Sequence, residues 1–214
     1  MGVYVVFVAG GIASGKSTVS RRLQRLGEAR IDLDEVSRAV LMPGSPVLTE
    51  VAAEFGQDLL SPATGELDRA ALAARAFASP EAIARLEAIE LPAIQSELAS
   101  RIEHARGAWE VTHACAVEVQ LLDKAIASGM IDLADEVIAV TCPLEIRRER
   151  AILRGMDGED FDRRVANQPT DAFLEEHADV VFDNSQGEDV LIGRTDKWWE
   201  RKMRHGWRNF GAAQ

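Results

Sequence analysis

The segment Gly10-Gly11-Ile12-Ala13-Ser14-Gly15-Lys16-Ser17-Thr18 constrains this chain more than any other. It matches the pattern G-x-x-x-x-G-K-[ST], in which glycines let successive backbone N–H groups turn toward phosphate oxygens. In this pattern the lysine brings a positive charge to the β- and γ-phosphates, and the serine hydroxyl ligates Mg²⁺. We therefore predict that these nine residues bind a nucleoside triphosphate, with Ser17 as the metal ligand.

The residues on either side supply the setting that such a loop needs. The apolar, largely β-branched run from Val3 to Val8 predicts a buried strand, and the spacing of Val19, Leu23 and Leu26 predicts a helix. A strand, a glycine loop and a helix in this order place the positive end of the helix at the anion. The alternative, a glycine turn followed by an incidental Lys-Ser, does not explain this order.

The length, composition and charge of the chain indicate its general class and exclude some kinds of binding partner. The 214 residues suffice for one α/β core with a small appended region, and 47% hydrophobic with 28% charged residues is typical of globular proteins. A net charge of -11 argues against a nucleic-acid surface. No apolar run reaches the ~20 residues of a membrane span, and the chain enters its first strand without a signal peptide. We therefore expect a cytoplasmic protein, a monomer or weak oligomer, with no nucleic-acid or membrane partner.

The two cysteines and four histidines show no pattern of their own. Cys115 and Cys142 lie far apart without C-x-x-C spacing, which favours two core residues in a reducing compartment over a disulfide. The histidines lack ligand spacing, so we assign none of them to a metal.

Asp32 and Asp34 follow the first helix, where Ala29 to Ile31 predicts a short second strand. Ligands bind at the carboxyl edge of an open α/β sheet, so both carboxylates are candidates for chemistry. One could support the Mg²⁺ shell while the other accepts a proton from a substrate hydroxyl. The alternative is that Asp34 only caps a helix starting at Glu35.

Residues 35–106 are rich in Ala, Glu and Leu and contain no convincing strand. Their turns and caps predict several helices, including one that begins at Pro80 and is interrupted at Pro92. A helical insertion of about seventy residues gives a kinase somewhere to hold its acceptor, which a bare hydrolase does not need.

The remaining chain predicts three more strands, within residues 109–119, 135–140 and 178–184. Polar residues at the end of the last strand, among them Asn184, are expected near the nucleotide base. A helix over 144–153 carries Arg147, Arg150 and Arg154 on one face. A solvated stripe is one interpretation, and a lid that delivers arginine to the transferring phosphate is the favoured one. In the basic, aromatic tail at 197–208, tryptophans that pack on the domain are favoured over a membrane or nucleic-acid contact.

A series of short motifs along nearly the whole chain follows the order of one known family. They are Gly10 to Val19, Ile31-Asp32-Leu33-Asp34, Arg38, Pro43-Gly44, Phe55-Gly56, Gly65-Glu66-Leu67-Asp68-Arg69, Leu72, Phe77, Arg150, Arg154, Arg164 to Gln168, Ala178-Asp179 and Asp183-Asn184. In these motifs the chain resembles the dephospho-CoA kinases, which phosphorylate the ribose 3′-hydroxyl of dephospho-CoA in the last step of CoA synthesis.

The resemblance implies an α/β P-loop kinase with a parallel five-stranded sheet flanked by helices. Residues 1–34 and 107–214 would form the nucleotide core, with a short helical lid at about 147–175, and residues 35–106 the helical CoA-binding lobe. ATP with Mg²⁺ would be the phosphoryl donor. Asp34 would be the base, Arg150 would clamp phosphate with Lys16 as a second catalytic residue, and Arg154 and Asn184 would contact ATP. The acceptor would bind at Asp34, Arg38, Arg69, Phe77 and Leu122.

The chain departs from the family pattern in four places. Ala13 replaces a glycine and Leu33 an alanine, and neither touches the expected chemistry. Leu91-Pro92 stands for His-Pro, and Glu118 to Lys124 stands for Asp-x-Pro-Leu-Leu-x-Glu, both where the acceptor is expected. A related small-molecule or nucleotide kinase with another acceptor, and a nucleotide-binding regulator without catalysis, are therefore the alternatives. A regulator has no need of a hydroxyl-activating acid, so Asp34 weighs against the latter.

Overall fold

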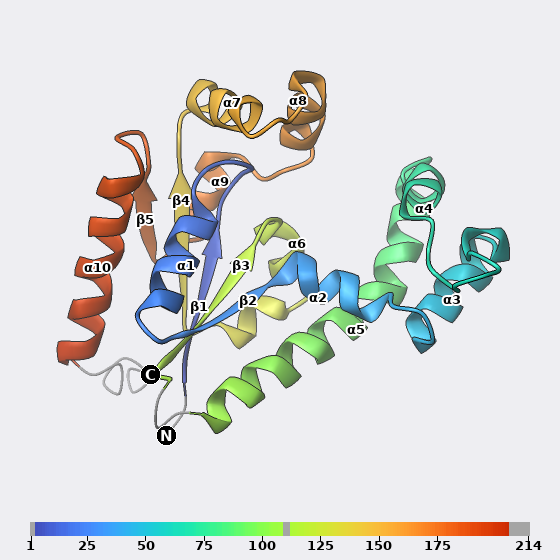
Figure 1. Cartoon of the computed structure of the whole chain (residues 1–214), viewed down its shortest axis with the longest axis horizontal. Helices are drawn as coiled ribbons and strands as arrows, with labels where there is room; N and C mark the ends of the chain where they lie inside the picture. Colours follow the sequence, from blue (N-terminus) through green and yellow to red (C-terminus); the bar gives the residue numbers. More distant parts are fainter. Residues whose placement is uncertain (1–2, 109–111, 206–214) are drawn as a thin grey trace. The chain divides into compact units, whose positions relative to one another are not determined.

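The computed structural model describes residues 3–108 and 112–205. Its centre is a five-stranded sheet of order β2-β3-β1-β4-β5, in which every neighbouring pair is parallel (Figure 1). The strands are β1 (Tyr4–Ala9), β2 (Ala29–Asp32), β3 (Ala114–Val119), β4 (Glu136–Thr141) and β5 (Val180–Asp183). The prediction of an α/β fold with a parallel five-stranded sheet is confirmed. Residues 109–111, part of the region in which we expected the third strand, lie outside the described residues.

Helices connect the strands and form the rest of the chain. They are α1 (Lys16–Arg25), α2 (Leu33–Val40), α3 (Pro46–Phe55), α4 (Arg69–Ala76), α5 (Pro80–Gly107), α6 (Leu122–Ala127), α7 (Leu144–Leu153), α8 (Gly158–Ala166), α9 (Asp171–Glu176) and α10 (Glu188–His205), with 3-10 turns at Gln57–Leu59 and Met130–Leu133. The expected interruption at Pro92 is wrong, because α5 runs through it. Alanine, glutamate and leucine around the proline favour helix strongly enough to offset one lost backbone hydrogen bond.

The sheet is buried on both faces, as a parallel sheet with helices on both sides must be. Every residue of β1, β3 and β4 is buried. Alternate residues of β1 face the side covered by α1 and α10, where Leu23, Leu191 and Trp198 complete the core. Trp198 and Trp199 are 2% and 7% exposed. The prediction that these tail tryptophans pack on the domain is confirmed, whereas tail residues 206–208 lie outside the described residues.

A buried charge pair fastens α10 to the sheet. The Lys202 ammonium lies 2.6 Å from Glu136 at the start of β4, and the Tyr4 hydroxyl donates to the same carboxylate over 2.8 Å. Burial and the neighbouring Glu136 raise the pKa of Tyr4 above its ordinary value, so the phenol remains a donor. The C-terminal helix is thus tied to the first strand by polar as well as apolar contacts.

The chain divides into two compact units. One comprises residues 1–32 and 102–214 and holds the sheet; the other, Leu33–Arg101, is helical. The helical unit has its own apolar core of Leu41, Val51, Leu59 and Leu72, with Phe55 and Leu86 among the residues packed around it. Among the helices that the structure describes, we find none with the length and apolarity that a bilayer crossing needs.

Candidate nucleotide-binding site

The loop of residues 10–15 connects β1 to α1 at the carboxyl edge of the sheet. Gly15 has φ +115°, a value that favours glycine, and the N–H groups of Thr18 and Val19 already bond back to its carbonyl oxygen. The first turn of α1 contains no acidic residue, so its positive dipole end is not neutralised. Thr18, further along this turn, directs its hydroxyl to Glu188, 3.4 Å away. The loop therefore has the backbone conformation and the helix end that favour a bound anion.

Lys16 is folded into its own loop. Its side-chain ammonium donates hydrogen bonds to the carbonyl oxygens of Gly10, over 2.7 Å, and Gly11, over 3.0 Å. The residue is only 8% exposed. The positive charge is therefore held within the loop.

Ala13 occupies a conformation that the sequence did not reveal. Its φ is +58°, in the left-handed region that costs a residue with a Cβ roughly 1–2 kcal/mol. The glycine that the family pattern has at this position would adopt the same conformation without that cost. The loop of this chain is therefore slightly strained.

Asn184, directly after β5, is bound to the loop. Its side-chain amide donates to the Ser14 carbonyl oxygen over 2.7 Å, and a Cβ on Gly15 would come within 2.4 Å of the same nitrogen. Asn184 is 4% exposed, and its Oδ1 has no hydrogen-bond partner among the described residues. The structure thus places Asn184 against the phosphate loop.

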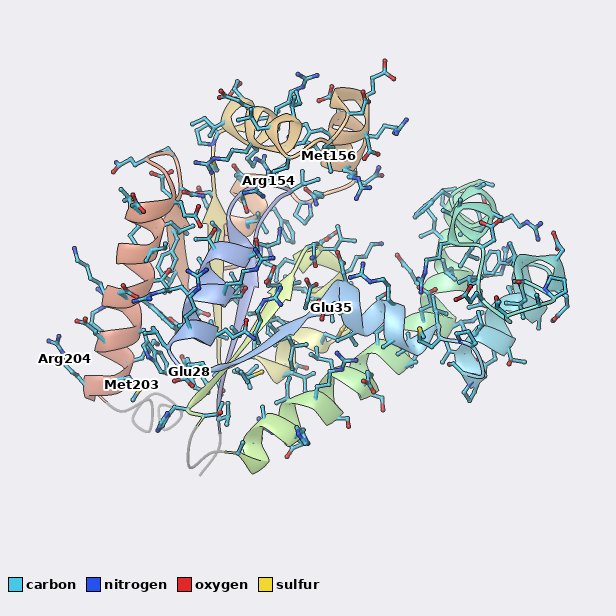
Figure 2. All side chains as sticks on the ribbon, viewed as in Figure 1. Glu28, Glu35, Arg154, Met156, Met203 and Arg204 are labelled. Carbon is cyan, nitrogen blue, oxygen red and sulfur yellow. The ribbon has the colours of Figure 1, made fainter. Side chains whose placement is uncertain are left out.

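The three arginines of α7 do not act as one stripe. Arg150 donates to the Asn184 carbonyl oxygen over 3.0 Å and approaches the sulfur of Cys142, 3.4 Å away. Arg154 is exposed at the end of α7, with Met156 just beyond it (Figure 2). Arg147 is buried. The interpretation of a purely solvated stripe is therefore wrong.

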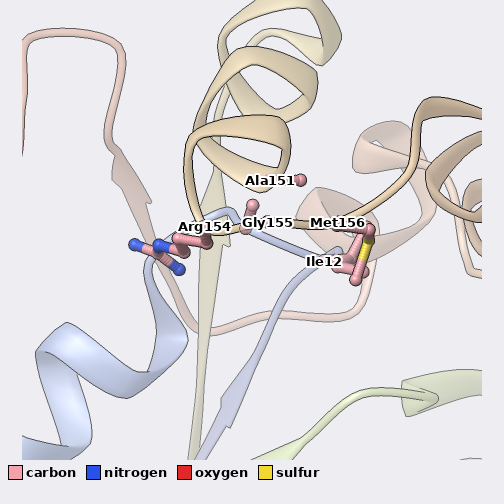
Figure 3. A pocket seen from close by; sticks show the side chains of 6 residues that line it. Ile12, Ala151, Arg154, Gly155 and Met156 are labelled. Atoms are coloured by element: carbon pink, nitrogen blue, oxygen red, sulfur yellow. The ribbon is translucent and has the colours of Figure 1, made fainter.

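A pocket of about 310 Å³ lies between the phosphate loop and the end of α7 (Figure 3). It is lined by Ile12, Ala13, Ala151, Arg154, Gly155 and Met156. Its walls are mostly apolar, and the Arg154 guanidinium lies at one side. The pocket therefore combines an apolar surface with one cation next to the loop.

The two cysteines are free and buried, one within β3 and one after β4. Burial raises the pKa of the Cys115 thiol to about 12 and that of Cys142 above its ordinary value. Both are therefore neutral packing residues, as the sequence predicted.

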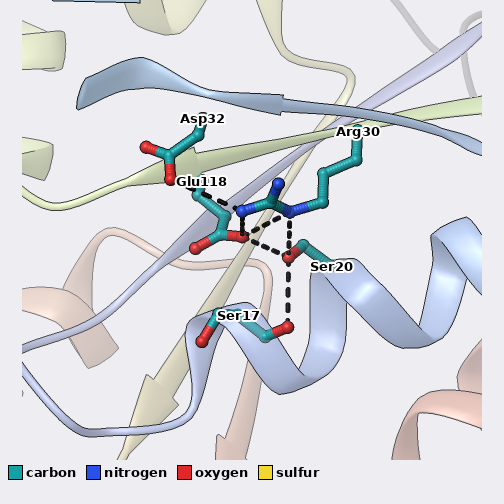
Figure 4. A network of polar contacts seen from close by, with 5 residues as sticks. All are labelled: Ser17, Ser20, Arg30, Asp32 and Glu118. Atoms are coloured by element: carbon teal, nitrogen blue, oxygen red, sulfur yellow. Dashed lines mark hydrogen bonds and ion pairs between the residues drawn. The ribbon is translucent and has the colours of Figure 1, made fainter. Parts of the chain in front are cut away.

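A polar network links the ends of β2 and β3 to α1 (Figure 4). Asp32 and Glu118 are register partners in the pairing of β2 with β3, and Arg30 forms an ion pair with each of them. Its guanidinium lies 2.6 Å from Glu118 and 3.4 Å from Asp32. Ser20 donates to Glu118 as well. Sequence reasoning missed Arg30, because only the pairing of β2 with β3 brings it to Glu118, 88 residues away.

The oxygen donors at this edge fit Mg²⁺, a hard cation that keeps several waters and phosphate oxygens in its shell. The Ser17 hydroxyl makes no hydrogen bond within residues 3–108 and 112–205 and stays available at the first turn of α1. No cluster of three or more His, Cys, Asp or Glu side chains suited to a metal occurs in those ranges. A magnesium ion here would therefore depend on the nucleotide for most of its ligands.

The predicted acceptor residues divide between the two units. Asp34 is exposed and is the second residue of α2, so the alternative that it precedes and caps this helix is wrong. Arg69 begins α4 and donates to the Arg38 carbonyl oxygen over 3.3 Å. Phe77 directly follows α4 and is 70% exposed. Leu122, in the sheet-bearing unit, is 0% exposed, so its side chain belongs to the core.

One half-buried carboxyl group of the helical unit, that of Glu90, has a raised pKa. Burial raises the pKa of Glu90 to about 7; nearby Arg69 opposes this shift and Glu87 adds to it. Glu90 directly precedes Leu91, where the chain departs from the family pattern.

The sheet order, the phosphate loop and the arginine-bearing helix define a P-loop kinase. A family model described as dephospho-CoA kinase matches residues 4–189. A curated relative of that name from Corynebacterium diphtheriae is 44% identical over 200 residues, covering 92% of this chain and 96% of the relative. The chain belongs to the dephospho-CoA kinase family.

Two solved structures share the fold. A Thermus thermophilus protein superposes with a TM-score of 0.78 at 25% identity, covering 94% of this chain and 98% of that protein. The dephospho-CoA kinase of Campylobacter jejuni gives a TM-score of 0.68 at 23% identity, with the same coverage. The predicted fold class and family are confirmed.

Proposed function

We propose that this chain transfers the γ-phosphoryl group of ATP to the ribose 3′-hydroxyl of dephospho-CoA, giving CoA and ADP. The observation that carries the proposal is the phosphate loop with its buried Lys16, in a chain whose family match extends over residues 4–189. The range that matches the family model includes residues of both units, so the match covers the helical unit as well as the loop.

ATP binds at the loop in this proposal. The N–H groups of the loop and the dipole of α1 hold the phosphates, and Lys16 turns from the Gly10 carbonyl toward the β- and γ-oxygens. Ser17 holds Mg²⁺, which neutralises charge on the phosphates when it is bound. Asn184, directly after β5, supports the loop through its bond to Ser14, and Arg150 of α7 in turn donates to the Asn184 carbonyl oxygen.

Asp34 is the general base. It accepts the proton of the 3′-hydroxyl, the freed oxygen bonds to the γ-phosphorus, and the bond to the β–γ bridging oxygen breaks to release ADP. Its exposure on the first turn of α2 leaves the carboxylate accessible to a ligand. The helical unit, with Arg38, Arg69 and Phe77, holds the acceptor; both arginines suit its phosphates, and the exposed Phe77 ring suits its apolar parts.

The lid lies within about residues 147–175 and brings Arg150 and Arg154 to the phosphates as charge moves from the γ-phosphoryl group to ADP. We further propose a cytoplasmic monomer or weak oligomer without nucleic-acid or membrane partners, from the charge of -11 and the apolar patterning.

An altered acceptor is the second candidate. One observation favours it: Asp123, in the segment that departs from the family pattern, has a buried Oδ1 without a hydrogen-bond partner in the described part of the chain. A buried oxygen in that state is suited to accept a hydrogen bond from a ligand group.

A panel of hydroxyl acceptors with Mg-ATP tests both candidates. Dephospho-CoA should give the highest kcat/KM, with CoA and ADP formed in equal amounts. Lys16→Ala, purified in the same way, controls for contaminating kinases. A far higher kcat/KM with another acceptor would replace the first candidate by the second.

A further inference from the structure

Arg147 is the buried member of the three arginines on α7. It is 7% exposed, and among the described residues its charged partner is Asp171 of α9, with Nη2 3.6 Å from Oδ1. Its Nε and that Asp171 oxygen have no hydrogen-bond partner within the same ranges. Keeping a guanidinium buried with so few partners is costly, so the position calls for a reason beyond stability.

The guanidinium lies directly on the phosphate loop. A Cβ added to Gly11 would come 1.7 Å from Nη1 and 3.0 Å from Cζ of Arg147, so the guanidinium would have to leave its present position. The φ of Gly11 lies outside the range that favours glycine. The observed position of the guanidinium therefore depends on glycine at position 11, whereas the backbone conformation there does not.

A second side chain holds the same part of the loop. Gln168, which follows α8, accepts a hydrogen bond from the Ile12 N–H over 2.8 Å. Its Oε1 would lie 3.5 Å from a Cβ at Gly11. The peptide between Gly11 and Ile12 is thus contacted by a cation from α7 and an acceptor from the segment before α9.

We propose that Arg147 is a positioning residue that fixes the Gly11–Ile12 part of the loop in the conformation that receives the phosphates. The arginine acts through Gly11, Asp171 orients it, and Gln168 holds the adjacent amide. This inference rests on the proposed binding of ATP at the loop and is independent of the acceptor.

The physical reason lies in how a flexible loop binds. When only a fraction of the molecules holds the loop in the binding conformation, the apparent Kd rises in inverse proportion to that fraction. A planar guanidinium covers a bare glycine peptide more closely than an aliphatic side chain does, and its charge favours a site for anions. The lid thereby prepares the loop before the nucleotide arrives.

A pair of substitutions tests the contact. Gly11→Ala alone should weaken binding of ADP and of a non-hydrolysable ATP analogue about a hundredfold, because the methyl group overlaps the guanidinium. Arg147→Ala alone should weaken it about tenfold. The double variant should regain affinity to within about threefold of Arg147→Ala, since the truncated side chain leaves room for the methyl group. Calorimetry gives the three Kd values.

Gly10→Ala is the matched control. A Cβ there would lie 2.5 Å from the Val140 carbonyl oxygen, a backbone atom that Arg147→Ala does not remove. The Arg147→Ala background should therefore restore nothing to Gly10→Ala. Equal rescue at both glycines would overturn the inference, because it would point to general loosening.

If Arg147 only stabilised the fold, its removal would lower the melting temperature and would not raise the KM for ATP selectively. We expect the ligand-free Arg147→Ala protein to melt within a few degrees of the parent. Its KM for ATP should rise about tenfold while its KM for the acceptor stays unchanged. If Arg147→Ala does not fold, Arg147→Met, which keeps the aliphatic stem, takes its place in both backgrounds.

The parent protein is measured first. A parent that binds neither nucleotide would overturn the proposed function together with this inference. If the parent binds the nucleotides, two results would overturn the inference alone. One is a double variant whose affinity is no higher than that of Gly11→Ala. The other is a Gly11→Ala protein whose affinity equals that of the parent.

Discussion

The Lys16 ammonium donates a hydrogen bond to the Gly10 carbonyl oxygen over 2.7 Å, six residues back along the chain. The lysine thus closes the loop on itself with its charge inside. An ammonium bound to neutral carbonyl oxygens exchanges them readily for phosphate oxygens, because the negative charge of the phosphate adds a direct attraction between opposite charges. The same side chain therefore shapes the empty loop and is available to bind the phosphates.

Replacing Lys16 by alanine should lower kcat by roughly 10²–10³ or more, the range for losing one preorganised electrostatic donor. Steady-state kinetics with saturating ATP measure the loss. Circular dichroism should show an intact fold, because the Lys16 ammonium bonds to carbonyl oxygens of the loop, outside the apolar core of the sheet. Near-normal turnover in a folded Lys16→Ala protein would contradict the assignment of this loop.

Replacing Asp34 by asparagine should lower phosphoryl transfer by about 10² or more, as expected for loss of a general base. The charge also lies in the first turn of α2, where it stabilises the helix by about 0.3–1 kcal/mol. The melting temperature should therefore fall only by a few degrees, and ATP should still bind. Glu35→Gln, in the same turn, is the control for the dipole. Unchanged kinetics would move the search for the base to Asp32 or Asp123.

Replacing Arg30 by methionine should destabilise the protein by about 3 kcal/mol, the range for breaking a buried charge pair. The variant leaves the carboxylates of Asp32 and Glu118, 17% and 4% exposed, beside each other without their shared cation. Urea unfolding measures the loss. The double variant Arg30→Met/Glu118→Gln should recover more than half of it; strictly additive losses would show that the pair is not coupled.

Glu90 should make stability depend on pH. Its pKa is raised from 4.5 to about 7, so the folded protein binds its proton more tightly than the unfolded chain. The stability from this proton is complete below pH ~4.5 and is lost as the pH rises through about 7. Glu90→Gln should therefore raise the melting temperature at pH 8 and have little effect at pH 5. Glu50→Gln, at an exposed position in the same unit, should change neither.

The local parts of the site could be predicted from the sequence. The strand, the loop and the start of α1 are consecutive residues, so their order alone predicted a phosphate site, and the structure confirms that order. Asp34 was likewise a candidate from its place after β2, and its role stays a prediction. Its position inside α2 was not predicted, because the boundary between strand and helix depends on packing that a four-residue strand does not encode.

The surroundings of the loop were decided by the tertiary structure. Gln168 meets Ile12 across 156 positions, and Asn184 meets Ser14 across 170. The three arginines of α7 looked equivalent because spacing on a helix shows only which residues share a face. Packing of α7 against the loop and α9 buried Arg147, tied Arg150 to β5 and left Arg154 exposed.

The sequence by itself therefore determined the class of fold, the phosphate loop and the family, since these follow from short patterns and their order along the chain. The tertiary structure decided which side chains surround Gly11, which cation bonds to Glu118 and which arginine lies on the loop. Each of these depends on side chains from distant segments meeting in space, and their distances are set by how the helices pack on the sheet.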